Sequence, residues 1–264
     1  MSMLIRRSEE NSHYYSSKGE PVHGNLRDAR KVMALPSVTN VIGATLKNEA
    51  LTRWIIEQAI LSTISLPKTQ GESEDEFVKR VMLDMDAEKN SKANLGTRVH
   101  ALEENLLLKQ EIDLVEQKEL WVFYEKLRGW NERVTQVYDT EFVVVSEEDA
   151  YAGKVDAYIN HVEHGKCIVD FKTRTARKLK KGRKLEVRDG DSLQLSAYRY
   201  AFLKGIENPE TKCLSVLIDS ETGDVHEHLW SEESVAESLD IFKSLCKVWR
   251  WVKGYDPRCP EADL

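Results

Sequence analysis

Cysteine is scarce in this sequence, with four residues among 264 and no Cys-x-x-Cys pair. This scarcity argues against a disulfide framework or a zinc knuckle, so we expect Cys167, Cys213, Cys246 and Cys259 to be free thiols. The 13 glycines and 6 prolines are too few for a collagen-like or low-complexity chain, and 41% of the residues are hydrophobic. No run approaches the roughly 18 consecutive apolar residues of a membrane helix, and the first residues lack a signal-peptide core. We therefore expect a globular cytoplasmic protein that has no membrane partner.

A net positive charge is also missing, because 38 basic and 45 acidic residues give a formal charge of −7. An acidic average argues against a nucleic-acid partner, since phosphate groups are bound by positive surfaces. One segment departs strongly from this average. Residues 172–188 contain nine Lys or Arg and one Glu, a net charge of +8, which leaves −15 on the rest of the chain. We expect this segment to concentrate a polyanion at one place on the protein.

The hydrophobic pattern predicts a helical first half. Residues 1–36 are polar and interrupted by Gly and Pro, so we expect an irregular arm. Ser37 and Asn48 are candidate N-caps for the two helices that follow this arm. Residues 67–75 are typical of a linker, and residues 88–92 of a polar break between helices. The helices expected around these interruptions cover residues 77–85, 93–109 and 114–138.

A switch to period two near Thr140 predicts strands in the second half. The expected strands cover residues 141–145, 151–160, 166–173, 214–219 and 225–230, and the second and third form an antiparallel hairpin. Asp191 and Ser231 are candidate caps of two further helices. We therefore expect one mixed α/β unit, in which the N-terminal arm and helices of residues 1–92 pack on a core of residues 93–264.

Four short sequences bring polar residues into definite geometric relations. They are Gly96-Thr-Arg-Val-His100-Ala-Leu-Glu-Glu104, Ala152-Gly-Lys-Val-Asp156, Ile168-Val-Asp170-Phe-Lys172 and Gln194-Leu-Ser-Ala-Tyr198. In each helical sequence the polar pair is spaced i, i+4 and shares one face, and Gly96 is expected to allow the close approach of other backbone. In the strand, Asp170 and Lys172 are two residues apart and point to one side. Two aspartates and a histidine that converge can bind a divalent cation, and a lysine beside them can stabilise phosphoryl charge.

At these residues the chain resembles the PD-(D/E)XK nuclease superfamily, specifically its RecB-type exonuclease branch. That branch carries Gly-Thr-x-x-His-x-x-x-Glu, Gly-x-x-Asp, Asp-x-Lys and Gln-x-x-x-Tyr, and all four occur here in that order. Leu35-Pro-Ser-Val-Thr-Asn-Val-Ile and Ala50-Leu-Thr-Arg-Trp54 look like the opening of phage-encoded members. The resemblance implies a restriction-endonuclease-like mixed sheet flanked by helices, in a bacterial or phage-infected cell.

The resemblance also implies roles for individual residues. His100, Asp156, Asp170 and the Phe171 carbonyl would hold one or two Mg²⁺ or Mn²⁺ ions. Lys172 would be the catalytic lysine, and it would act together with Asp156, Asp170 and Glu104. Glu141 would support the metal site, while Gln194 and Tyr198 would brace it or bind substrate. The cysteine pattern of relatives that hold an iron-sulfur cluster is missing, so no such cluster is expected.

The basic segment lies between the strand that bears Asp170 and the helix that bears Gln194. We expect its cations to bind DNA, either at a linear duplex end or along a single strand. They are Arg174, Arg177, Lys178, Lys180, Lys181 and Arg183. A solvated loop is the plainer alternative, because runs of like charge are usually solvated. In the same way, Asp170 and Lys172 could be a surface pair worth less than ~1 kcal/mol.

These observations predict a metal-dependent deoxyribonuclease, most simply an exonuclease in recombination, repair or replication. A structure-specific endonuclease on the same scaffold is a first alternative, which cleavage of circular and linear DNA would separate. A non-catalytic DNA-binding subunit is a second, disfavoured because each metal and lysine position of the motif is filled. The oligomeric state is left open.

Overall fold

A mixed sheet of six strands, in the order β1-β5-β6-β7-β10-β11, forms the centre of the protein. The computed structural model describes residues 6–7, 12–47, 49–115, 117–179, 182–206 and 208–259. The sheet consists of β1 (Arg6–Arg7), β5 (Val134–Ser146), β6 (Tyr151–His161), β7 (Gly165–Arg174), β10 (Lys212–Asp219) and β11 (Val225–Leu229). Strands β7 and β10 are parallel, and the other neighbours are antiparallel. The predicted mixed α/β fold is confirmed.

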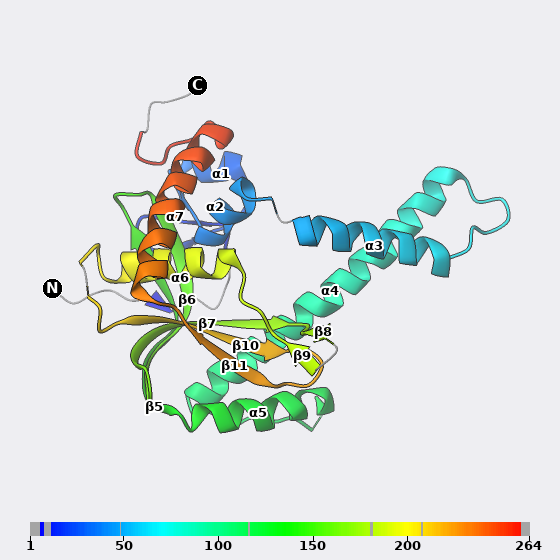
Figure 1. Ribbon diagram of the computed structural model, residues 1–264. Helices are drawn as coiled ribbons and strands as arrows, with labels where there is room; N and C mark the ends of the chain where they lie inside the picture. Colours follow the sequence, from blue (N-terminus) through cyan, green and yellow to red (C-terminus); the bar gives the residue numbers. More distant parts are fainter. Residues whose placement is uncertain are drawn as a thin grey trace.

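Helices cover both faces of this sheet (Figure 1). Helices α2 (Val38–Thr45), α6 (Asp189–Phe202) and α7 (Glu232–Lys253) pack on one face, and the end of α4 (Glu74–Leu107) with α5 (Trp121–Asn131) packs on the other. Alternate residues of β7 enter the two cores: Ile168 packs towards α6, whereas Cys167 and Val169 pack towards α4 and α5. A strand buried on both faces reads as a nearly continuous apolar run, so a charged residue within it must find its partners inside the protein.

The N-terminal segment is more regular than the predicted irregular arm. The strands β2 (Tyr14–Tyr15), β3 (Pro21–Val22) and β4 (Leu35–Pro36) form a small sheet, and α1 (Leu26–Lys31) lies between the last two. Asn25 and Asp28 form a capping box at the start of α1. Gly19 and Gly24 lie in the connections between very short elements, whereas Pro21 and Pro36 belong to β3 and β4, and the tyrosines of β2 are buried.

Two boundaries in the helical region differ from prediction. Helix α4 runs without interruption through residues 88–92, a polar stretch that contains Glu and Lys, which are good helix formers. The expected helix of residues 114–138 is divided into η1 (Lys118–Leu120), α5 and the start of β5. Val134–Tyr138 belongs to the strand because it pairs with the end of β6 through two bulges. The proposed division at residue 92 lies inside α4, and it stays a prediction.

A helical hairpin projects from the core (Figure 1). It consists of α3 (Glu49–Ser65) and the first half of α4, joined by the predicted linker. The same helix α4 then enters the core and contacts β5 and β7. The expected cap Asn48 lies outside the described residues.

Other predicted helix ends are confirmed or corrected. The side chains of Ser37 and Ser231 each cap a helix as expected, α2 and α7 respectively. Asp191 is not the N-cap of α6: it is the third helical residue and accepts the Arg188 backbone N–H in a capping box. All four cysteines are free thiols, as predicted. None of the described helices has the length and apolar composition that a bilayer-spanning helix needs.

Candidate active site

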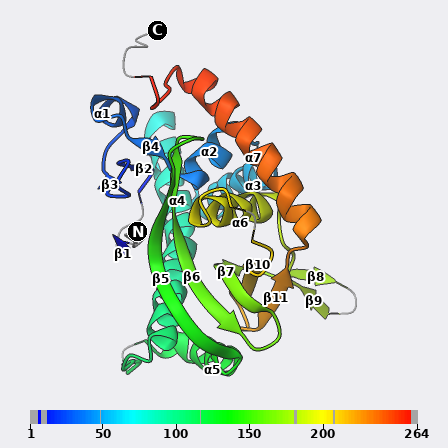
Figure 2. The ribbon, with the colours of Figure 1, turned by 90° about the vertical axis from the view of Figure 1, so that its left-hand side faces the viewer.

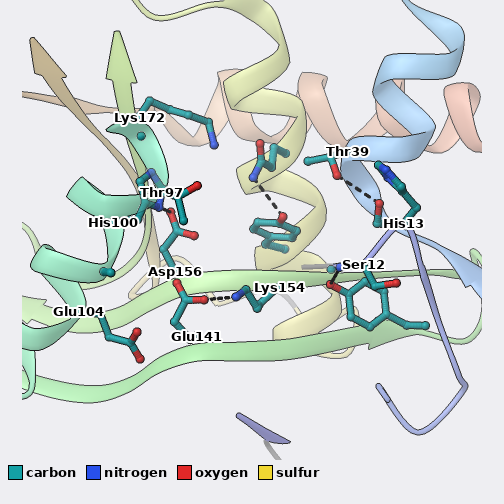
Figure 3. A pocket seen from close by; sticks show the side chains of 17 residues that line it. Ser12, His13, Thr39, Thr97, His100, Glu104, Glu141, Lys154, Asp156 and Lys172 are labelled. Carbon is teal, nitrogen blue, oxygen red and sulfur yellow. Dashed lines mark hydrogen bonds and ion pairs between the residues drawn. The ribbon is translucent and has the colours of Figure 1, made fainter. Parts of the chain in front are cut away.

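A cavity of about 570 Å³ lies where α4 and α6 meet β5, β6 and the N-terminal segment (Figure 3). Seven of the predicted site residues line it, from three strands and two helices: His100, Glu104, Glu141, Asp156, Lys172, Gln194 and Tyr198. Asp170 lies beneath this surface and contacts two of them. The fold therefore brings together side chains that are up to 98 positions apart in the sequence.

Asp156 enters the cavity where two strands separate. Main-chain pairing of β6 with β7 ends at Ala157 and Val169. Beyond this point the Phe171 N–H donates to Oδ2 of Asp156 over 2.7 Å instead of to a strand partner. Burial raises the pKa of Asp156, while the ammonium groups of Lys172 and Lys154 and the Phe171 hydrogen bond act against that shift.

Asp170 is fully buried, and only one of its two carboxylate oxygens has hydrogen-bond partners among the described residues. Its Oδ1 accepts from Nζ of Lys172 at 2.6 Å and from Nε2 of Gln194 at 2.8 Å. Its Oδ2 is buried and has no hydrogen-bond partner in the part of the chain that the structure describes. Burial raises the pKa of Asp170 to about 6, although the neighbouring Lys172 lowers it. A buried carboxylate oxygen without a hydrogen-bond partner lowers the stability of the folded protein, so a bound cation or proton at this oxygen would be stabilising.

His100 and Glu104 face the cavity from successive turns of α4. The Nδ1 atom of His100 lies 3.9 Å from Oδ2 of Asp156. Burial, followed by the Lys172 charge, lowers the pKa of His100, which favours the neutral imidazole that binds metals. Glu104 lies further along the helix, with Oε1 3.5 Å from the Thr140 hydroxyl.

Gln194 and Tyr198 brace the buried aspartate. Nε2 of Gln194 donates to Asp170 and also to the Tyr198 hydroxyl at 3.0 Å. Gly153 on β6 makes room for the tyrosine ring, since a Cβ at that position would overlap it. Gly96 has no such role: nothing lies within 4 Å of a Cβ built there, so the expected backbone approach at Gly96 is wrong.

Several residues of the cavity were not predicted. Lys154 forms an ion pair with Glu141 beside Asp156, and its position two residues before Asp156 in a strand was the available signal. On the opposite wall, Ser12, Ser37 and Thr39 contribute hydroxyl groups. Figure 3 shows Ser12 and Thr39 on the side of the cavity away from Asp156 and Glu141, and the hydroxyl of Thr39 lies 3.1 Å from that of Ser37. This wall depends on the N-terminal segment folding back, which no local pattern indicates.

The basic segment forms a hairpin instead of a loop. Strands β8 (Arg177–Leu179) and β9 (Gly182–Lys184) pair beyond the end of β7 and stand apart from the main sheet (Figure 2). Arg174 does not face the cavity, because it donates to both carboxylate oxygens of Asp191 at 2.6 and 2.7 Å. Arg177 is exposed on β8. Lys180, Lys181 and the side chains of Lys178 and Arg183 lie outside the described residues.

A second group of titratable side chains lies at the far end of β6. His161, His164 and Glu227 have potential ligand atoms within 4.8 Å of one another. The Glu163 N–H donates to Nδ1 of His161, so the neutral ring carries its proton on Nε2, which faces Glu227 at 3.2 Å. Trp130 and Arg133 also contact Glu227, each at 2.7 Å. Glu227 is therefore held by Trp130, Arg133 and His164, whereas Nε2 of His161 is buried and makes no hydrogen bond among the described residues.

Comparison with known proteins gives similarity to solved structures but no match at the level of sequence. No protein-family model and no curated protein matches the sequence. Among solved structures, the chain is similar to a crystal structure described as a putative exonuclease from Eubacterium rectale, with 14% sequence identity and a TM-score of 0.39. The similarity covers 65% of this chain and 62% of that chain, less than two thirds of its length. A similarity at this level does not assign the chain to a family or to an activity.

Proposed function

We propose that this protein is a metal-dependent deoxyribonuclease, an exonuclease that hydrolyses phosphodiester bonds from DNA ends. The observation that carries the proposal is the buried Oδ2 of Asp170, which has no hydrogen-bond partner among the described residues. Its carboxylate contacts Lys172 and lies beneath the cavity that Asp156 lines. An unsatisfied buried carboxylate oxygen is costly, so its position directly beneath a charged cavity favours a cation that would bind it there. Recombination, repair or replication would supply the DNA ends.

The donors suit a hard divalent cation in their chemistry, but the ligand atoms of His100, Asp156 and Asp170 do not all lie within 4.8 Å of one another in the described part of the chain, so they would draw together around the ion. Asp156, Asp170, His100 and the Phe171 carbonyl would hold Mg²⁺ or Mn²⁺, because these ions take oxygen ligands and Mn²⁺ also accepts imidazole. When bound, such an ion lowers the pKa of a coordinated water and neutralises charge on the phosphoryl oxygens. The Phe171 N–H keeps Oδ2 of Asp156 in place. Removing this kind of supporting hydrogen bond typically weakens metal binding by about 10–100-fold.

Lys172 would complete the chemistry. Its ammonium group is held at 2.6 Å from Oδ1 of Asp170, on the side of the cavity where Gln194 also lies. From there it would orient the attacking water and stabilise the negative charge that develops on the phosphoryl oxygens. Gln194 and Tyr198 would hold Asp170 in position for both roles. The cations of the β8-β9 hairpin would attract the phosphate backbone.

The decisive experiment uses linear duplexes labelled at either end, incubated with Mg²⁺, with Mn²⁺ or with EDTA. We expect end-dependent cleavage that needs the metal and is lost in Lys172→Met. Lys166→Met is the matched control, because Lys166 is an exposed lysine of the same strand, outside the cavity. Circular DNA should be resistant. Cleavage of the circle would support a structure-specific endonuclease instead, and the absence of metal-dependent cleavage on every substrate would contradict nuclease function.

A further inference from the structure

The ion pair between Lys154 and Glu141 lies within the candidate active site. Lys154 and Asp156 are two residues apart on β6, and both side chains line the cavity. Figure 3 shows Lys154 reaching across to Glu141, with Asp156 beside the pair. The Lys154 side chain is only 9% exposed and that of Glu141 18%, so this is not a solvated surface pair. A positive charge is therefore fixed against the acidic side of the site, away from Lys172.

The backbone of Glu141 supports a specific role for this pair. Glu141 lies between Thr140 and Phe142, which both pair with β6, yet its φ of 50° is in the left-handed region. Residues other than glycine adopt this conformation at a cost, and such residues concentrate at functional sites. Here the left-handed backbone conformation occurs at a glutamate whose side chain lines the cavity.

The fixed charges of the site can be counted. Four carboxylates, of Glu104, Glu141, Asp156 and Asp170, lie in or directly beneath the cavity. Two ammonium groups, of Lys154 and Lys172, oppose them. The balance is two negative charges, and a histidine ligand binds metal as a neutral ring. One divalent cation neutralises this balance, whereas a second would leave an excess positive charge in a partly buried site.

We infer that the cavity binds one divalent cation, and that the Lys154 ammonium group takes the place of a second one beside Glu141 and Asp156. The inference rests on the proposed function, because it concerns the same metal site. Lys154 is a positioning residue here: it holds Glu141 and offsets the charge of Asp156 without contacting the metal. Loss of Lys154 would leave three negative charges, with Glu141 and Glu104 available beside Asp156 for another ion.

The test counts bound metal and does not depend on cleavage. Isothermal titration of the intact protein with Mn²⁺, without DNA, should give one ion for the wild type. Lys154→Met should bind two ions, as should the polar variant Lys154→Gln. The double variant Lys154→Met/Glu141→Gln restores the original balance of two negative charges, so its count should return to one. Lys166→Met, the exposed lysine control, should keep the wild-type count, and circular dichroism should confirm that each variant is folded.

The outcomes separate this inference from the proposed function. Two ions on the wild type would overturn the inference and leave metal-dependent nuclease function intact. One ion on the wild type and still one on both single Lys154 variants would show that Lys154 does not exclude a second ion. No Mn²⁺ binding by the folded wild type would overturn the metal site itself, and the proposed function with it.

Discussion

The ring of Tyr198 packs directly over Gly153, so closely that a Cβ at position 153 would overlap Cε1 of the tyrosine. Through this contact β6, which also bears Asp156, fixes the position of Tyr198 on α6. The hydroxyl of Tyr198 accepts a hydrogen bond from Gln194. We predict that Gly153→Ala displaces Tyr198 and lowers the free energy of unfolding by about 1–3 kcal/mol, as overpacking of a core does. Urea unfolding measures this loss. The single-turnover cleavage rate should fall as well, because Gln194 loses a support.

Gly96 provides the control for this variant. It lies in α4, and nothing is within 4 Å of a Cβ built there. Gly96→Ala should therefore raise the free energy of unfolding by about 0.5–1 kcal/mol, the usual gain for alanine over glycine inside a helix. If Gly153→Ala were as stable as Gly96→Ala, the close packing of Tyr198 on Gly153 would be refuted.

The second prediction concerns Asp170. Asp170→Asn keeps the shape of the side chain and removes the charge that would bind the cation. Loss of a supporting hydrogen bond alone costs about 10–100-fold in metal affinity, so loss of this ligand should lower cleavage by at least about 100-fold. Thermal unfolding should show an intact fold, since burial already raises the pKa of Asp170 to about 6 and a neutral group is tolerated there. Asp113→Asn, at an exposed position, is the control. Cleavage by Asp170→Asn at a rate near that of the wild type would show that Asp170 is not a metal ligand.

The third prediction uses a buried carboxyl group outside the cavity. Glu103 on α4 is fully buried, and its Oε1 accepts from Nδ2 of Asn131 at 2.9 Å. Its Oε2 has no hydrogen-bond partner among the described residues. Burial raises the pKa of Glu103 well above its usual value, and the Asn131 hydrogen bond opposes this only in part. The folded protein therefore prefers the protonated form of Glu103.

The sign of the pH dependence follows from that preference. Because the folded pKa is above the unfolded value of about 4.3, Glu103 reduces stability as the pH rises from about 4 through the folded pKa. Glu103→Gln imitates the protonated form and should raise the free energy of unfolding by about 1–3 kcal/mol at pH 7.5. The gain should disappear near pH 4. Urea unfolding at both pH values measures it, with the exposed Glu125→Gln as control, and a gain independent of pH would contradict the explanation.

The sequence predicted the charged side chains that meet at this cavity better than it predicted the opposite wall, which Ser12, Ser37 and Thr39 form. His100, Asp156, Asp170 and Gln194 belong to short patterns whose helix or strand period already decides which side chains share a face. Their convergence then follows from the topology, since α4, β6, β7 and α6 all adjoin one part of the sheet. Lys154 could have been found by the same period-two reasoning, applied two residues before Asp156.

Other features could not be read locally. Ser37 was recognisable as a helix cap, but its place in the cavity depends on a bridge to Ala152, more than a hundred positions away. The start of β5 at Val134 depends on pairing with the end of β6, which overrides the helical pattern of α5. In both cases a long-range contact, not local propensity, decides the structure.

The last prediction concerns the basic hairpin, where a net charge of +8 in residues 172–188 contrasts with −15 on the rest of the chain. Arg174 is already engaged by Asp191, which leaves the cations further along the hairpin as the partners for phosphate. Replacing Arg177, Lys178, Lys180 and Lys181 by Ala should flatten the slope of log affinity against log salt by up to about 0.9 for each lost contact with duplex DNA. Single-turnover cleavage at saturating enzyme should fall much less, because Asp170 and Lys172 remain in place.

A control variant removes the same number of charges from exposed lysines elsewhere, and it should leave the slope unchanged. These lysines are Lys68, Lys109, Lys118 and Lys247. Equal slopes for the hairpin variant, the control variant and the wild type would mean that the hairpin is only a solvated surface and that DNA is bound elsewhere.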